Sequence, residues 1–145
     1  MAADSFDLMP ATVTVAEAQD FQVGYQEFDH PVIARQIDLI RKTFPDVDTT
    51  GRAYCRVEQR RQGHPWHFDT GTKGHMAWCY VTGRVLLSDP DSDFEGGGYY
   101  FRHDPTTAIF GYLDLVFYTS ADNEHFVASH SGERRVLLMF LERQP

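Results

Sequence analysis

The triplet His67-Phe68-Asp69 places an imidazole and a carboxylate two positions apart, in a stretch, GHPWHFDTGT, that reads as the end of a β-strand. Side chains at positions i and i+2 of a strand project to the same side, so His67 and Asp69 face one common space. These donors suit a non-haem iron(II) site of the two-histidine, one-carboxylate kind, which keeps coordination positions open for other ligands. A second histidine from a distant strand has to complete such a site.

That second histidine has to be chosen among the seven in the chain, and its context favours His125. His125 follows a predicted strand and a short loop, and it precedes a predicted hairpin. The second strand of this hairpin opens with Arg134 and Arg135 and is apolar on both faces. A buried arginine needs an anionic partner, and a dicarboxylic cosubstrate would supply one that matches the guanidinium fork. If both arginines lie at the solvated end of the strand, no such partner is needed.

The elements that must position these residues are mostly strands. One helix is predicted over residues 31–44, where Pro31 suits the first helical position and Pro45 ends the helix. Its apolar stripe, which we expect to pack on a sheet, consists of Ile33, Ile37, Ile40 and Phe44. Alternating and β-branched patterns predict strands within 52–61, 75–89, 98–103, 107–119, 124–130 and 134–142, with a turn at 89–98. Strands joined by turns after a single helix favour an antiparallel sandwich or barrel over a doubly wound parallel sheet.

Composition and charge narrow the class of protein. A length of 145 residues predicts one domain, and 42% hydrophobic with 14% aromatic residues predicts a packed globule. The net charge of −8 disfavours binding to a phosphate backbone, so nucleic acid is not an expected partner. The sequence begins without the pattern of a signal peptide and has no apolar run of roughly 20 residues, so we expect no membrane partner and a cytoplasmic location. Cys55 and Cys79 are expected to be small buried hydrophobes.

Four motifs in order resemble those of the iron(II)/2-oxoglutarate oxygenases, and most closely the prolyl 4-hydroxylase-like branch. They are HFD at 67–69, DFEGGGYYF at 93–101, LDLVFY at 113–118 and HFVASHSGERRVLLMF at 125–140. The resemblance covers roughly residues 53–142 and implies a mainly β fold with a double-stranded β-helix, or jelly-roll, core at about 51–143. Residues 1–50, with the predicted helix, would support this core within a single domain spanning 1–145.

The same resemblance implies which residues bind the cofactors. Fe(II) would be held by His67, Asp69 and His125. A basic residue nine or ten positions after the last histidine would bind the far carboxylate of 2-oxoglutarate. The SGER turn aligns this role with Arg134, and Arg135 is the alternate. No catalytic residue beyond the iron site is implied, and the substrate-binding residues stay unknown.

The activity implied by the resemblance is that of a 2-oxoglutarate-dependent dioxygenase, which uses O2 to hydroxylate a C–H bond and releases succinate and CO2. A prolyl residue in a peptide or protein is the expected substrate, because the motifs are closest to that branch and little lid sequence is present. A free amino acid or another small metabolite is the alternative on the same iron site. An alternative from another class is a non-catalytic, cupin-like module that binds a metal or another ligand but has no reason to hold 2-oxoglutarate.

Two positions depart from the family pattern. His130 stands where many relatives carry a small apolar residue. The tyrosine that often lies upstream of the first histidine and helps to hold 2-oxoglutarate has no counterpart, because Val57 and Glu58 occupy that region. The contacts that hold a cosubstrate, apart from the one with Arg134, are therefore not predicted by the resemblance.

Other polar or glycine-rich positions have simpler interpretations. His64 and His75 flank the HFD motif and could contact a substrate, although loop histidines are more often solvated. His103, in FRHDPTT, is expected to lie in a turn. The glycines at 96–98 lack the following helix that a phosphate-binding loop needs, so we expect them to form a tight turn beside a sheet edge.

Overall fold

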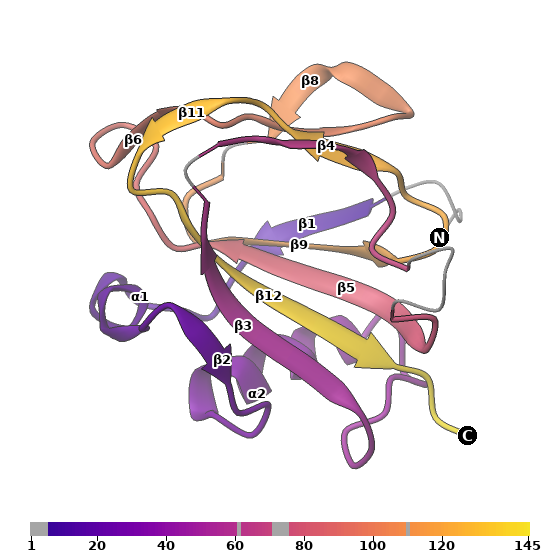
Figure 1. Ribbon diagram of the computed structural model, residues 1–145. Coiled ribbons are helices and arrows are strands. Elements are labelled where there is room, and N and C mark those ends of the chain that lie inside the picture. The colour runs from indigo at the N-terminus through magenta and orange to yellow at the C-terminus, as the bar shows by residue number, and fades with distance from the viewer. Residues whose placement is uncertain (1–5, 61, 71–75, 110) are drawn as a thin grey trace.

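The computed structural model describes residues 6–60, 62–70, 76–109 and 111–145, and it is built mainly from strands (Figure 1). The prediction at His75 lies outside the described residues. In chain order the elements are β1 (Phe6–Pro10), α1 (Val15–Asp20), β2 (Gly24–Gln26), α2 (Pro31–Arg41), β3 (Ala53–Gln59), β4 (His64–His67), β5 (Cys79–Leu86), β6 (Phe94–Gly96), β7 (Tyr99–Phe101), β8 (Asp104–Ile109), β9 (Asp114–Thr119), β10 (His125–Val127), β11 (His130–Gly132) and β12 (Arg135–Glu142).

The strands form a jelly roll of one large and two small sheets. The large sheet has the order β1-β9-β5-β12-β3-β2, a second sheet has the order β4-β10-β7-β8, and β11 pairs with β6. Neighbouring strands are antiparallel throughout these sheets. The helices lie on one side of the large sheet and the small sheets on the other (Figure 1). This arrangement confirms the predicted mainly β fold with a double-stranded β-helix core.

Helix α2 packs on the large sheet through the stripe that the sequence predicted. The four side chains of the stripe, Ile33, Ile37, Ile40 and Phe44, are all buried. Pro31 occupies the first turn, and the Nδ1 atom of His30 accepts a hydrogen bond from the backbone N–H of Val32. The regular helix ends at Arg41, and the chain to Phe44 continues as a turn. Each buried isoleucine contributes roughly 1.5–3 kcal/mol of hydrophobic stabilisation.

The N-terminal fifty residues contribute more than the single helix expected from the periodicity. β1 and β2 are the edge strands of the large sheet. Helix α1 begins with a capping box in which Thr14 and Glu17 exchange hydrogen bonds, and Glu17 also pairs with Arg35 of α2 at 2.8 Å. These strands and α1 are too short for a clear periodic pattern, because six helical residues or three to five strand residues hold few apolar positions.

Two strand boundaries also differ from expectation. The stretch predicted as one strand at 107–119 forms β8 and β9, separated around Gly111. The stretch predicted as a turn at 89–98 contains the short strand β6, which pairs with β11. Among the described residues, no helix is long and apolar enough to cross a lipid bilayer.

Candidate metal centre

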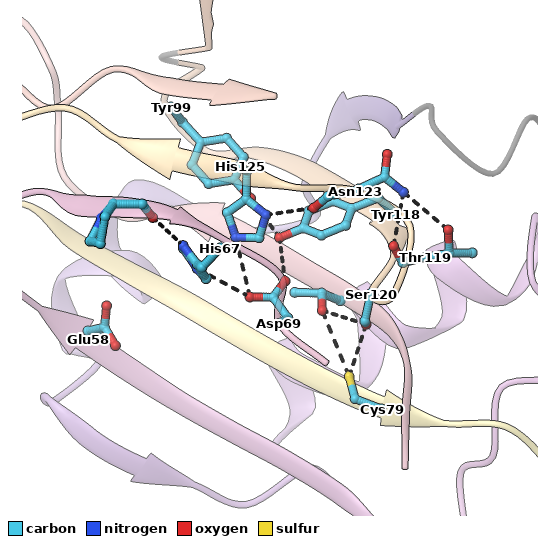
Figure 2. Close-up of polar contacts among 12 residues, drawn as sticks. Glu58, His67, Asp69, Cys79, Tyr99, Tyr118, Thr119, Ser120, Asn123 and His125 are labelled. Atoms are coloured by element: carbon cyan, nitrogen blue, oxygen red, sulfur yellow. Dashed lines mark hydrogen bonds and ion pairs between the residues drawn. The ribbon is translucent and has the colours of Figure 1, made fainter. Parts of the chain in front are cut away.

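His125 meets His67 and Asp69, which lie far from it in the sequence, between the six-stranded and the four-stranded sheet. His67 is the last residue of β4, Asp69 follows two positions later, and His125 opens β10. β4 and β10 are paired with His125 directly opposite His67, so strand register alone brings the two imidazoles together. One donor atom from each of the three residues lies within 4.8 Å of the others, and Figure 2 shows the side chains pointing toward one another.

The hydrogen bonds of the two histidines fix which ring nitrogen is free. The Nδ1 atom of His67 lies 2.7 Å from the carbonyl oxygen of Pro65, and that of His125 lies 2.9 Å from the carbonyl oxygen of Asn123. A carbonyl can only accept, so each Nδ1 carries the proton and donates it. Each Nε2 atom therefore presents a lone pair, as a metal-binding imidazole must.

The carboxylate of Asp69 completes the group with one oxygen and is held by the other. Its Oδ1 atom lies 3.3 Å from Nε2 of His125 and 3.7 Å from Nε2 of His67. Its Oδ2 atom accepts a hydrogen bond from the Tyr118 hydroxyl at 2.8 Å. That hydroxyl also lies 2.6 Å from the hydroxyl of Tyr99 (Figure 2). Asp69 is thus oriented so that one oxygen points at both imidazoles.

The protonation states favour a bound cation. Burial, followed by the neighbouring His125, lowers the pKa of His67 to about 4, so its imidazole is neutral at pH 7. Burial alone would raise the pKa of Asp69, but the neighbouring His125 and the hydrogen bond from Tyr118 outweigh it and lower this pKa to about 2. Three potential ligand atoms, one from each side chain, thus face one another within 4.8 Å. The donor set of two imidazoles and one carboxylate fits non-haem iron(II).

A cavity of about 660 Å³ opens in front of these three residues. Its wall on the large sheet comes from β3 and β12, through side chains on the face that turns away from the helices. On β12 these are Val136, Leu138 and Phe140, which form an apolar surface. Phe68 and Tyr54 also line the cavity and stay 42% and 37% exposed, so its outer part is accessible from solvent. The volume suits a cosubstrate together with a segment of a larger molecule.

The two arginines that the sequence could not separate lie on opposite faces of the large sheet. Arg134 is 7% exposed, lines the cavity and donates from Nε to the carbonyl oxygen of Gly97 at 3.1 Å. Arg135 points to the helices, where it donates to the carbonyl oxygens of Phe21 at 2.7 Å and Ala18 at 3.2 Å. Of these two arginines, Arg134 is therefore the one that can contact a ligand in the cavity.

The glycines at 96–98 make room for Arg134. Gly97 has a φ of +72°, and a Cβ atom there would lie 2.8 Å from Cδ and 2.9 Å from Nε of Arg134. The turn expected beside a sheet edge is present, since Gly96 ends β6 and Gly98 precedes β7. Its contact with Arg134 is a role that the sequence did not indicate.

The remaining histidines of the described residues stay outside the group of three. His64 stacks on His67, with ring centroids 3.6 Å apart, and lines the cavity. His103 lies exposed in a turn, as predicted. His130 binds the backbone, with Nε2 2.6 Å from the carbonyl oxygen of Arg60. This hydrogen bond gives the departure at position 130 a structural role.

Cys55 and Cys79 are buried and free, as predicted. Cys55 belongs to the apolar core between α2 and the large sheet. The Sγ atom of Cys79 lies 3.0 Å from the Ser120 hydroxyl, within a small buried polar cluster (Figure 2). Burial raises the pKa of Cys55 to about 12 and that of Cys79 to about 11, so both are unreactive thiols at neutral pH.

Three residues near the centre were missed by sequence reasoning. Tyr118 and Tyr99 lie in runs that alternate as buried strands do, so nothing marked their hydroxyl groups as polar contacts. Arg84, in the middle of β5, lines the cavity and stacks over the ring of Tyr99. A charged residue between Gly83 and Val85 in an otherwise apolar strand was the one signal that could have indicated it.

Solved structures share this fold along nearly the whole chain. The prolyl-4-hydroxylase of Pseudomonas putida has a TM-score of 0.68 at 15% identity, with 95% of this chain and 84% of that chain covered. The viral collagen prolyl hydroxylase of Paramecium Bursaria Chlorella virus-1, in a 2OG complex, has a TM-score of 0.68 at 12% identity, with 97% and 96% covered. The prolyl hydroxylase of Trichoplax adhaerens, in complex with a hypoxia inducible factor peptide fragment, has a TM-score of 0.60 at 11% identity, with 83% and 62% covered.

No protein-family model matches the sequence, and no curated protein matches it. The likeness is therefore one of structure at low identity, and what it establishes is the fold. The predicted similarity to the prolyl 4-hydroxylase-like oxygenases holds at that level.

Proposed function

We propose that this chain is an Fe(II)/2-oxoglutarate-dependent dioxygenase of the prolyl hydroxylase type. The observation that carries the proposal is the convergence of three potential metal-ligand atoms, from His67, Asp69 and His125, at a cavity that also contains the buried guanidinium of Arg134. A metal ion and a distant positive charge in one cavity fit a ligand that has a chelating end and a second carboxylate. 2-Oxoglutarate has both.

Each residue of the centre has a task that follows from its surroundings. His67 and His125 would bind iron through Nε2, because their Nδ1 protons are held by backbone carbonyl groups. Asp69 would bind through Oδ1, because Oδ2 is held by Tyr118. Arg134 would anchor the far carboxylate of 2-oxoglutarate with its terminal nitrogens, since Nε is already bonded to Gly97.

Iron held by these residues, together with 2-oxoglutarate and O2, would supply the oxidising power for the conversion of a C–H bond to an alcohol, with release of succinate and CO2. The protein's own residues would orient the cosubstrate and exclude water from it. Val136, Leu138 and Phe140 offer the cosubstrate an apolar wall beside Arg134, which limits the access of water to its far carboxylate. Arg134 and the three metal ligands together would fix both ends of the cosubstrate, so that a substrate on the open side of the cavity would be held in one orientation.

A prolyl residue in a peptide or protein is the substrate we propose. The large cavity is lined at its accessible part by the aromatic rings of Phe68 and Tyr54, and such rings accept proline side chains of an extended peptide. The structural neighbours include prolyl hydroxylases, one of them in complex with a peptide fragment. Proline-containing peptides compared with free amino acids, each scored by mass spectrometry for one added oxygen, test this choice.

The experiment that tests the cofactor site is an anaerobic visible absorption titration. Metal-free protein receives Fe(II) and then 2-oxoglutarate, with His67→Ala and Arg134→Ala as matched variants. We expect a weak charge-transfer band that requires both additions and is absent in His67→Ala. Arg134→Ala should need about tenfold to a hundredfold more 2-oxoglutarate, the loss expected for one charged hydrogen-bond partner.

Circular dichroism of each variant shows that the fold is retained. If a folded, iron-loaded wild-type protein gives no band at any 2-oxoglutarate concentration, the dioxygenase proposal is wrong. The chain would then be a metal-binding module of the same fold.

A further inference from the structure

A second arginine shares the inner end of the cavity with Arg134. Arg84 lies in the middle of β5, where it is paired with Leu138 of β12 and Val116 of β9. Both Arg84 and Arg134 line the main cavity, and both line a small recess behind it together with Tyr99. In the part of the chain that the structure describes, neither guanidinium has a carboxylate within 4.0 Å. Two cations therefore line the same space without a carboxylate in direct contact with either.

The position of Arg84 is fixed by its neighbours. Its guanidinium carbon lies 3.6 Å from the centre of the Tyr99 ring, a close cation–π contact with a buried aromatic residue. The backbone of β5 is held by strands on both sides, so the side chain projects from a rigid sheet. Arg84 also makes a side-chain hydrogen bond with Tyr99. A guanidinium has five N–H donors, so the remaining ones can bind a ligand.

The two guanidiniums repel each other in the free protein. Burial lowers the pKa of Arg134 to about 9, and the positive charge of Arg84 is the next contribution in the same direction. Both groups still carry a proton at pH 7, so the repulsion persists across the cavity. An anion placed between them turns this repulsion into attraction, which gives the site a preference for a negatively charged ligand.

We propose that Arg84 is a second cosubstrate-binding residue, and that Arg84 and Arg134 together hold the distal carboxylate of 2-oxoglutarate. This inference rests on the proposed function and deepens it. The absent upstream tyrosine, whose region holds Val57 and Glu58, is then compensated from a different strand. The carboxylate oxygens would be divided between the terminal nitrogens of Arg134 and the N–H groups of Arg84 that Tyr99 does not bind.

A purely structural role for Arg84 would have a different effect on ligand binding. The hydrogen bonds that connect Tyr99 to the metal centre show which effect to expect. Tyr99, under Arg84, bonds to Tyr118, which in turn bonds to the metal ligand Asp69. If Arg84 only supported Tyr99, its loss would disturb the metal end of the site. Any 2-oxo acid would then bind more weakly, whether or not it has a second carboxylate.

The test compares two ligands on one set of variants. Protein loaded with Mn(II) is titrated calorimetrically with 2-oxoglutarate and with 2-oxobutyrate, which has the same chelating end but no distal carboxylate. We expect Arg84→Met to lower the affinity for 2-oxoglutarate by about tenfold to a hundredfold and to leave the affinity for 2-oxobutyrate unchanged. Arg60→Met is the matched control, because Arg60 also lines the cavity but is paired with Glu58 at 2.6 Å. Its affinity for both ligands should equal that of the wild type.

Two further variants sharpen the result. Arg84→Lys keeps the charge but not the planar fork, so it should lose less affinity than Arg84→Met, and it also serves if the methionine variant does not fold. In the double variant with Arg134→Met, the losses should be non-additive, because both side chains hold the same carboxylate.

The outcomes separate the two proposals. Wild-type protein that binds Mn(II) but not 2-oxoglutarate would overturn the proposed function itself. Wild-type binding that is lost in Arg134→Met but retained in both Arg84 variants would overturn only the role of Arg84. Equal losses for 2-oxoglutarate and 2-oxobutyrate in Arg84→Met would also overturn it, because they would indicate structural support alone.

Discussion

The two faces of the large sheet carry different kinds of side chain. The face toward the helices carries apolar side chains that join the main core, among them Val57, Val81, Val85, Leu115, Phe117, Leu137 and Leu141. The face toward the cavity carries charged, aromatic and apolar side chains side by side, among them Arg56, Glu58, Arg84, Arg134, Val136, Leu138 and Phe140. Successive residues of each strand alternate between these faces.

This difference assigns fold stability to one face of the sheet and ligand binding to the other. The helix-side face is packed by α2 and holds the strands in place, so the cavity-side face can keep charges that stabilise the fold little. A ligand site needs such groups to be rigid but unsatisfied before the ligand arrives. Each prediction below compares a residue of one face with a matched residue of the other or of the outer surface.

The largest effect is expected from adjacent leucines of β12. Leu137 is fully buried on the helix side, whereas Leu138 lines the cavity and is only partly buried. Leu137→Ala should lower the free energy of unfolding by about 2–5 kcal/mol, because it leaves a hole in a packed core. Leu138→Ala should cost about 1 kcal/mol or less, since its side chain already contacts open space. Urea denaturation of both variants measures this difference, and equal losses would contradict the division into two faces.

The adjacent arginines should separate stability from ligand binding. Arg135→Met removes two charged hydrogen bonds to the carbonyl groups of Ala18 and Phe21, at a cost of about 1.5–3 kcal/mol in unfolding free energy. Its affinity for 2-oxoglutarate should not change. Arg134→Met should lower the affinity for 2-oxoglutarate, measured by calorimetry, and should leave the free energy of unfolding, measured by denaturation, nearly unchanged. A loss of 2-oxoglutarate binding in Arg135→Met would place the anchor on the wrong side of the sheet.

Tyr118 tests whether a neutral side chain of the cavity-side face supports the metal site. Tyr118→Phe keeps the ring but removes the hydroxyl that donates to Oδ2 of Asp69. Mn(II) affinity should fall by about tenfold to a hundredfold, the range typical for a lost partner of a metal ligand. Tyr100→Phe is the control, because Tyr100 stacks on Phe126 and does not line the cavity. Unchanged Mn(II) binding in Tyr118→Phe would mean that Asp69 needs no such support.

The smallest effect concerns the two cysteines, which both resist ionisation. The thiolate is the reactive form, and a raised pKa moves its appearance to higher pH. With pKa values of about 11 and 12, Cys79 and Cys55 should not react with iodoacetamide in the folded protein at pH 8. As pH rises, Cys79 should react first, because hydrogen bonds from Ser120 and Thr82 stabilise its thiolate. Peptide mass spectrometry detects the labelling, and protein unfolded in urea is the positive control.

The proximity of His67, Asp69 and His125 could be predicted from the sequence, because these residues lie in ordered motifs. His67 and Asp69 are two positions apart, and His125 follows a strand that resembles the family pattern, so three weak signals supported one another. The structure brings these three side chains together. The predicted helix and its apolar stripe were also confirmed. Four apolar positions at helical spacing are a strong local signal for a helix that packs against a core.

The contacts around these three residues could not be predicted from the sequence, because they depend on which strands become neighbours. Arg134 and Arg135 could not be separated, since β12 lies between two strands and has apolar side chains on both faces. The Tyr99–Tyr118 hydrogen bond joins residues of two different sheets. Arg84 had no local signal of its partners, because its closest contact is the ring of Tyr99 fifteen positions later. Pairing between distant strands, rather than local propensity, decides these contacts.

The edge strand β1 has a consequence for handling this protein. Residues Phe6–Pro10 cover the outer side of β9, pairing with it from Asp114 to Tyr118. Without them, a strand that reads DLVFY would offer free N–H and C=O groups along an apolar edge, which is a template for joining other chains. Shortening the N-terminus to improve expression would therefore favour aggregation, whereas Pro10 at the end of β1 helps to keep the natural edge from being extended further.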